Sequence, residues 1–195
     1  MSEPRLGLRE RNRARTYAEI TEAALGLFER QGFDATTVDQ IAAAAGISPA
    51  TFFRYFATKE DVLFTDEDGS AAELVAAVAQ RADRRTSSVA ALAEPIVAFA
   101  EAMPGPGSPH SRELTKLVMT TPSLAARSLR IRLHWERDVA AQLAAEDGLA
   151  TPTLLHTAVA SAAVSCLTSG LRHWPNNSPS ALASLVRDAF RYTTS

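Results

Sequence analysis

The chain lacks the features by which several protein classes are recognised. Its single cysteine, Cys166, excludes an internal disulfide, and the small apolar residues around it are typical of a buried, inert thiol. The four histidines show no spacing with cysteine or carboxylate residues that would suit a metal ion. The sequence also has almost no alternation of apolar and polar residues, so the expected fold class is all-α.

Signals of catalysis, secretion and membrane insertion are missing as well. No nucleophile elbow, phosphate-binding glycine loop or zinc motif is present, which indicates a protein that is not an enzyme and holds no cofactor or metal. No basic start followed by an apolar run marks a secretion signal. The longest apolar stretch, residues 158–167, contains serines and is shorter than a bilayer requires. We therefore expect a cytoplasmic protein with no membrane partner.

The most informative segment that is present is residues 36–59, TTVDQIAAAAGISPATFFRYFATK, which predicts two short helices joined by a tight turn. Thr37 and Gln40 have the spacing of a capping box at the start of the first helix. Gly46 suits the left-handed residue that ends this helix. Ser48 is then a favourable N-cap for the second helix. Such a pair is typical of a helix-turn-helix that reads the major groove of DNA.

The second of these helices has an apolar side and a polar side. Phe52 and Phe56 lie four residues apart and should face the core. Arg54 can donate two hydrogen bonds to the O6 and N7 atoms of guanine, and the small residues at the helix start allow close approach to base edges. The remaining polar residues are expected to reach phosphates. The residues expected to contact DNA are Thr37, Ser48, Pro49, Ala50, Thr51, Arg54, Tyr55 and Lys59.

With an upstream helix that ends at Gly32, these residues resemble the TetR family of transcriptional regulators. The resemblance runs from Ile20 to Phe64 and implies a nine-helix architecture, with a three-helix DNA-binding domain followed by a six-helix domain for ligand binding and dimerisation. Phe53 departs from the pattern, because many relatives carry there a tyrosine whose hydroxyl often meets a phosphate. The matching pieces are Leu27-Phe28, Gly32-Phe33, Thr36-Thr37-Val38, Ile41-Ala42, Ala45-Gly46-Ile47-Ser48, Thr51-Phe52-Phe53-Arg54-Tyr55-Phe56 and Lys59.

We expect three parts along the chain: a basic flexible arm over residues 1–15, the DNA-binding domain over residues 16–58 and the helical domain over residues 59–195. The arm holds five arginines against two glutamates, and it either contacts DNA or is a solvated tail. A connecting helix is expected from about residue 59 to residue 82, where Gly69 could bend it.

The helix expected over residues 122–146 is the candidate ligand site of the helical domain. Its apolar residues could line an interior and its arginines could bind phosphates, although an ordinary amphipathic helix has the same pattern. The run from Pro122 to Glu136 resembles an actinobacterial branch of the family with proposed acyl-CoA-like ligands, which implies a small apolar or amphipathic effector. The expected lining residues are Leu124, Ile131, Arg132, Trp135 and Val139.

Two final helices, expected over residues 152–173 and 178–191, carry the prediction of a dimer. The first is small or apolar nearly all round, so it must be buried on more than one face. Two such helices from each of two chains would form a four-helix interface, as the resemblance implies, although packing within one chain is the alternative. The expected interface residues are Leu155, Val159, Ala162, Ala163, Leu182, Leu185, Val186 and Phe190.

The helix-turn-helix predicts binding to double-stranded DNA. The resemblance to the TetR family implies a nucleoid-associated homodimer that binds a palindromic operator and is released when a small-molecule effector binds. The resemblance implies repression as the outcome. The alternative is an architectural or cell-division factor that uses the same DNA-binding head under the control of a protein partner.

Overall fold

The protein is all-helical throughout the part of the chain that its computed structural model describes, residues 7–64, 67–103, 111–176 and 181–194. For residues 8–10, 67, 68 and 111 the backbone alone is described. These ranges contain nine α-helices and three short 3-10 helices, which confirms the expected fold class. The chain divides into two compact units, residues 1–65 and residues 66–195.

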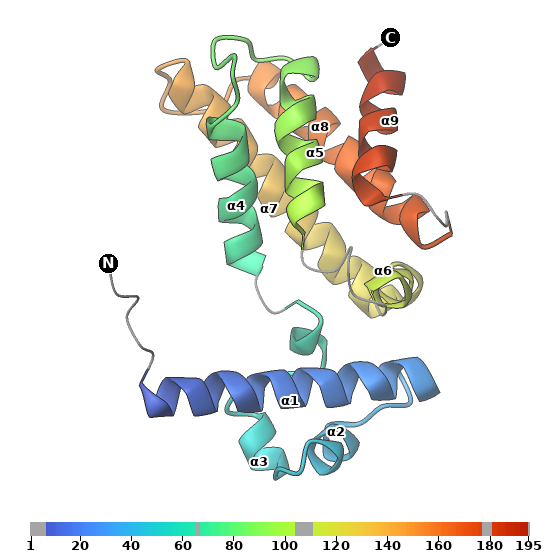
Figure 1. Ribbon diagram of the computed structural model, residues 1–195. Coiled ribbons are helices and arrows are strands. Elements are labelled where there is room, and N and C mark those ends of the chain that lie inside the picture. The colour runs from blue at the N-terminus through green and yellow to red at the C-terminus, as the bar shows by residue number, and fades with distance from the viewer. Residues whose placement is uncertain (1–6, 65–66, 104–110, 177–180, 195) are drawn as a thin grey trace. The chain divides into compact units, whose positions relative to one another are not determined.

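The first unit consists of one long helix and two short ones. Figure 1 shows α2 and α3 together along one side of α1. Six phenylalanine and isoleucine side chains make most of its core because the helical spacing turns them to the same side. The helices are α1 (Leu8–Gln31), α2 (Val38–Ala44) and α3 (Pro49–Phe52), followed by the 3-10 helix η1 (Glu60–Val62). The buried core side chains include Ile20, Phe28, Phe33, Ile41, Phe52 and Phe56.

Helix α1 begins at Leu8, so the prediction of a flexible arm over residues 1–15 is wrong for its second half. Residues 8–15 include leucine, arginine, glutamate and alanine, which favour a helix, and no glycine or proline interrupts the chain before Gly26. The expectation of a flexible arm was based on the many arginines of this segment and did not take its helix propensity into account. Arg5 lies outside the described residues, and the side chain of Arg9 is not described.

The connecting helix expected over residues 59–82 is also wrong in extent. Residues 60–62 form η1, and helix α4 spans only Glu67–Ala79. Val62 is buried and Lys59 binds the backbone of the α1–α2 loop, so this segment belongs to the first unit. The boundary between the units therefore lies after residue 65 instead of residue 58. Gly69 lies in the first turn of α4 and not at a bend within a longer helix.

The second unit is a bundle of six helices. Helix α7 packs on α4, α6 and α8, whereas α9 packs on α5 and α8, so α8 lies between α7 and α9 (Figure 1). The predicted helix over residues 122–146 is confirmed to the residue. The helices after α4 are α5 (Ala93–Ala102), α6 (Ser111–Thr120), α7 (Pro122–Glu146), α8 (Leu154–His173) and α9 (Leu182–Thr194), with the 3-10 helices η2 (Ala90–Leu92) and η3 (Trp174–Asn176).

Helix α8 combines length with apolar composition. Residues 154–176 are by length and hydropathy alone sufficient to cross a membrane, so the expectation that no stretch is long enough was wrong. However, 44% of that window is buried inside the unit, and Ala163, Val164 and Leu167 have no exposed surface. Small and apolar side chains on α8 thus serve the contacts with α7 and α9, as in the central helix of a bundle.

Gly170 allows α8 and α9 to approach closely. A Cβ atom at this position would lie 2.6 Å from Cγ2 of Val186 and 3.2 Å from the Val186 backbone nitrogen, and both residues are buried. The glycine is therefore required by packing, because its conformation is an ordinary helical one.

We predict that Gly170→Ala lowers the free energy of unfolding by about 1–3 kcal/mol, the usual cost of overpacking a core. Gly26→Ala is the matched control, since a Cβ there meets only the flexible end of Arg30, at 3.1 Å, and should gain up to about 1 kcal/mol of helix propensity. Urea unfolding measures both variants. The explanation is wrong if Val186→Ala does not reduce the cost of Gly170→Ala in the double variant.

Candidate nucleic-acid interface

The turn between α2 and α3 has the predicted local geometry. The Thr37 hydroxyl accepts the Gln40 N–H at 3.2 Å, while the Gln40 side chain accepts the Thr37 N–H at 2.9 Å, which completes the capping box. Gly46 has a φ of 67°, in the left-handed region. The Ser48 hydroxyl accepts the Thr51 N–H at 3.1 Å, and Pro49 occupies the first helical position. The predictions for the capping box, Gly46 and Ser48 are therefore confirmed.

Helix α3 has only four residues, and the core beneath it holds it in place. Phe52 is fully buried and Phe56 is 4% exposed, with ring centroids 5.5 Å apart. The Tyr17 ring of α1 lies 4.8 Å from that of Phe56. Helical hydrogen bonding continues beyond the helix, because the Phe56 N–H donates to the Phe52 carbonyl at 3.0 Å. The segment from residue 49 to residue 56 is thus one ordered turn.

The outward side of this turn carries the residues expected to read DNA. Ala50 and Arg54 are exposed, and Thr51 and Tyr55 are half-buried beside them. Arg54 makes no ion pair within the described part of the chain, and its guanidinium lies 6.0 Å from the Tyr55 ring centroid. Its donors are therefore available for a partner outside the protein. Phe53 is 56% exposed on the same side.

Lys59 has a different position from the one expected. Its ammonium group donates to the backbone carbonyls of Phe33 at 2.7 Å and Thr36 at 2.8 Å, and it lies 4.3 Å from the Phe33 ring centroid. Two of its three N–H donors are thus used inside the unit. The prediction of a phosphate contact treated Lys59 as a free surface cation, but it ties the end of the DNA-facing turn to the α1–α2 loop.

Two residues that the sequence reasoning missed also stabilise this loop. Gln31 donates to the Gln40 side chain at 2.9 Å and to the Ala35 carbonyl at 3.2 Å. Thr36 is 1% exposed and donates to the Gly32 carbonyl at 2.7 Å. The polar residues just after α1 therefore position the capping box of α2. The position of Gln31 just before Gly32, at the predicted end of the helix, could have indicated this role, because polar side chains there commonly bond to backbone groups of the following loop.

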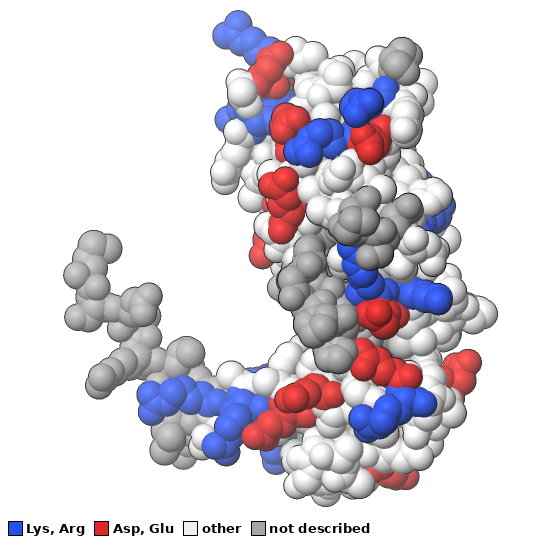
Figure 2. Space-filling model, turned by 45° about the vertical axis from the view of Figure 1, so that its right-hand side comes forward, with Lys and Arg blue, Asp and Glu red and all other residues white. Residues whose placement is uncertain are grey.

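Basic side chains gather over the N-terminal half of α1, as Figure 2 shows. Arg11, Arg13 and Arg15 are exposed, and Arg15 pairs with Glu19 at 3.6 Å. The chain as a whole has a net charge of −2. An electrostatic attraction to phosphates would therefore depend on this local excess of positive charge on α1.

The expected ligand-site residues of α7 lie mainly in the core of the second unit. Leu124 and Val139 have no exposed surface and Trp135 is 7% exposed, with its ring edge-to-face against Phe99. Ile131 is half-buried against the same core. The Arg132 guanidinium donates hydrogen bonds to the Glu136 carboxylate at 2.7 Å and to the Ser165 hydroxyl at 3.1 Å.

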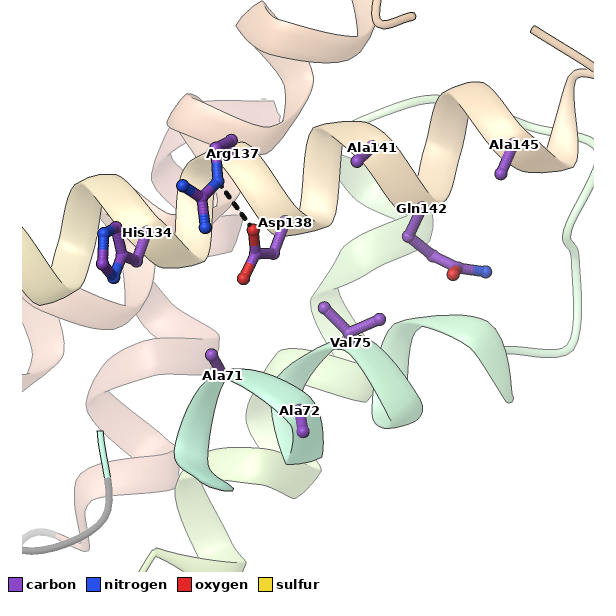
Figure 3. Close-up of a pocket in the computed structure, with 9 residues that line it drawn as sticks. All are labelled: Ala71, Ala72, Val75, His134, Arg137, Asp138, Ala141, Gln142 and Ala145. Atoms are coloured by element: carbon purple, nitrogen blue, oxygen red, sulfur yellow. Dashed lines mark hydrogen bonds and ion pairs between the residues drawn. The ribbon is translucent and has the colours of Figure 1, made fainter. Parts of the chain in front are cut away.

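A groove is found on a different side of α7, where α4 faces it. Among the described residues it has a volume of about 610 Å³, and none of the five expected residues lines it. Its walls combine small apolar residues with a few polar ones, and Arg137 pairs there with Asp138 at 2.9 Å (Figure 3). The lining residues are Ala71, Ala72, Val75, His134, Arg137, Asp138, Ala141, Gln142 and Ala145.

Residues 20–65 match the family model described as bacterial regulatory proteins of the TetR family, and residues 86–195, more than half of the chain, match the MftR C-terminal domain. The chain belongs to the TetR family. It is therefore a DNA-binding transcriptional regulator and not an enzyme, and the helix-turn-helix prediction is confirmed at this level.

Two curated transcriptional regulators of actinobacteria are similar to the chain. The transcriptional regulator TcmR of Streptomyces glaucescens is 36% identical over 148 residues, which cover 73% of this chain and 65% of TcmR, just under two thirds of its length. A putative mycofactocin biosynthesis regulator, MftR of Mycobacterium tuberculosis, is 29% identical over 180 residues, which cover 92% of this chain and 90% of that protein.

The fold is also that of solved TetR-family structures. FadR of Bacillus subtilis, crystallised in complex with stearoyl-CoA, superposes with a TM-score of 0.59 at 16% identity, over 92% of this chain and 98% of that one. At this identity the likeness establishes the shared architecture alone.

Most of the residues expected at the dimer interface lie inside the chain's own core. Five of the eight are at most 6% exposed, because α8 packs on both α7 and α9 and the inner side of α9 closes the bundle. Leu155 is 55% exposed, and Ala162 and Leu185 are half-buried. The five core residues are Val159, Ala163, Leu182, Val186 and Phe190.

A buried ion pair fixes α4 against α7 at one end of the groove. Arg81 follows α4 and contacts the Glu146 carboxylate at 2.7 Å, with side chains only 2% and 5% exposed. Gln142, which lines the groove, donates to the same carboxylate at 2.8 Å. Burial alone would raise the pKa of Glu146, but the hydrogen bonds from Arg81 and Gln142 outweigh it and hold that pKa below its ordinary value.

We predict that Glu146→Gln lowers the free energy of unfolding at pH 7 by up to about 3–5 kcal/mol, because it leaves the buried Arg81 without a counter-charge. The pKa of Glu146 is lower in the folded state than in the unfolded state. The stabilisation that ionised Glu146 provides is therefore complete above its unfolded-state pKa and is lost as the pH falls through its folded-state pKa. The difference between wild type and variant should therefore shrink in acid, as measured by urea unfolding.

The matched control is Glu101→Gln, which removes a partner of an exposed pair, 3.8 Å from Arg187 with side chains 48% and 60% exposed. It should change stability by less than about 1 kcal/mol at any pH. A stability difference for Glu146→Gln that stays constant with pH would contradict the ion-pair explanation.

Proposed function

We propose that this TetR-family protein is a repressor that binds a palindromic operator as a homodimer and leaves it when a small apolar or amphipathic effector binds. It would act at the chromosome, in the cytoplasm. The observation that supports this proposal best is the ordered turn of residues 49–56, which presents Arg54 outward while the core holds Phe52 and Phe56. An ordered turn whose guanidinium makes no ion pair with any described residue is suited to recognition of base edges.

The proposed contacts to DNA divide by chemistry. Arg54 binds guanine through two hydrogen bonds, and Ala50 allows the backbone to approach the base edges. Tyr55 and Thr51 reach phosphates from the flanks of the turn. The remaining contacts, from Thr37, Ser48 and Pro49, lie at the two helix starts, and Lys59 retains one N–H for a phosphate.

The proposed dimer uses the outer surfaces of α8 and α9. Leu155 and Ala162 on α8 lie on the surface that the intrachain bundle leaves uncovered, together with Leu154, which is 85% exposed. On α9 the corresponding residues are Leu185 and Tyr192, the latter 77% exposed. Apolar residues exposed on two neighbouring helices are typical of an interface with a second copy. Two copies are also needed because one short turn reads too few base pairs.

The effector is proposed to bind in the groove between α4 and α7. Alanines and Val75 provide an apolar surface, and His134 and Gln142 provide polar groups at its edge. Helix α4 directly follows the DNA-binding unit in the chain, so a ligand that changes the spacing of α4 and α7 would act at the connection between the units. Because the FadR relative was crystallised with stearoyl-CoA, an acyl-CoA is the first effector class to test.

We predict that Arg54→Ala lowers affinity for a duplex selected from a random pool by about 1–3 kcal/mol per half-site and relaxes the preference for guanine at one position. The wild type should enrich a two-fold symmetric sequence. Arg30→Ala, on the far end of α1, is the control and should leave the selected sequence unchanged. If Arg54→Ala enriches the same sequence with the same guanine preference, the assignment of Arg54 is wrong.

We predict that a long-chain acyl-CoA reduces affinity for the selected duplex, as measured by fluorescence anisotropy. Ala141→Trp fills the groove and should abolish this release without changing DNA affinity. Ala126→Trp places the same side chain at an exposed position of α7 outside the groove and should respond as the wild type does. Equal release from both variants would show that the groove is not the effector site.

A further inference from the structure

Phe53 is an exposed aromatic residue at the centre of the DNA-facing turn. Its side chain is 56% exposed, whereas the four other phenylalanines of the core beneath it are at most 4% exposed. Single exposed apolar residues are common on protein surfaces, so exposure alone assigns no role. The position of the ring relative to Arg54 and to the core is what makes it informative. The buried phenylalanines are Phe28, Phe33, Phe52 and Phe56.

The ring of Phe53 is held in a defined place. Its backbone N–H donates to the Pro49 carbonyl at 3.0 Å, which continues the helical geometry of α3 through this residue. Its ring packs edge-to-face against the ring of Phe52, with centroids 5.6 Å apart and planes at 89°. Because Phe52 has no exposed surface, it anchors one side of the Phe53 ring to the core.

The outward neighbours of Phe53 are Ala50 and Arg54. Residues three and four apart share one side of a helical turn, so Ala50, Phe53 and Arg54 form a continuous outward surface. Ala50 and Phe53 are apolar, and the exposed guanidinium of Arg54 is the charged group of this set. The surface therefore combines one hydrogen-bond donor group with an apolar patch directly beside it.

Only one feature of the major groove is complementary to such a patch. A phenyl ring can neither donate nor accept a hydrogen bond, so it cannot bind phosphates or the polar atoms of base edges. The C5-methyl group of thymine is the apolar feature of the major groove, and phenylalanine is among the side chains that contact it. Resting on the proposed DNA-binding function, we propose that Phe53 determines specificity by contacting a thymine methyl group next to the guanine bound by Arg54.

The test removes the methyl group from the DNA and the ring from the protein. In the selected duplex, each thymine is replaced in turn by deoxyuridine at both symmetric positions, and dissociation constants are measured at 150 mM salt for wild type, Phe53→Ala and Phe53→Leu. At one thymine near the Arg54 guanine, the wild type should lose about fourfold in affinity per half-site, as expected for uncovering one methyl group.

Phe53→Ala should bind the unmodified duplex at least fourfold more weakly and show no further loss at that thymine. Phe53→Leu should retain part of the methyl dependence, because leucine still offers an apolar surface. Tyr55→Phe is the matched control, since it changes the neighbouring aromatic residue and should keep the full deoxyuridine effect. Thermal unfolding of all variants verifies that each is folded.

Three results would overturn the inference. The first is that Phe53→Ala keeps the deoxyuridine effect of the wild type. The second is that Phe53→Ala weakens binding equally on all duplexes. The third is that the wild type loses affinity at none of the thymines replaced by deoxyuridine. A wild type that selects a defined sequence with any of these results leaves the proposed function intact. A wild type without sequence preference would overturn the proposed function together with this inference.

Discussion

The DNA-facing turn depends on the burial of Phe52 and Phe56. A helix of four residues has no stability of its own in water, because the cost of nucleation exceeds what a single turn of hydrogen bonds returns. Here the two rings anchor the turn in the core of the first unit, and Tyr17 of α1 packs against Phe56. Hydrophobic packing on one side thus fixes the positions of Arg54 and Phe53 on the other.

Polar contacts complete this arrangement from both ends of the turn. The capping box of α2 and the Ser48 cap set the start of each helix, and Lys59 binds two carbonyls of the α1–α2 loop. In the second unit, the buried Arg81–Glu146 pair likewise holds α4 to α7 beside the groove. In both units, buried contacts position an open surface, as binding sites on rigid scaffolds require.

The sequence predicted those features that depend on neighbouring residues. The caps, the left-handed Gly46 and the inward spacing of Phe52 and Phe56 each involve contacts within a few residues and were confirmed. The contacts of Lys59 with the Phe33 and Thr36 carbonyls were not predicted, because a long side chain can reach partners far away in the sequence. The side chains of α8 could not be sorted into core and interface, since this helix is small or apolar nearly all round, and the one apolar side of α9 suits packing within the chain as well as packing on a second copy. The groove depends on how α4 and α7 pack, which no local pattern encodes.

The central claim is that two copies of this turn read a symmetric DNA site. DNase footprinting of the purified protein on the DNA upstream of its own gene, at physiological salt with competitor DNA, tests it most directly. The account predicts a protected site with two-fold symmetry, whose half-sites are separated by about 10 base pairs or a multiple of that spacing. Protection without a defined site, lost steeply as salt is raised, would show that binding is electrostatic and nonspecific and would contradict the account.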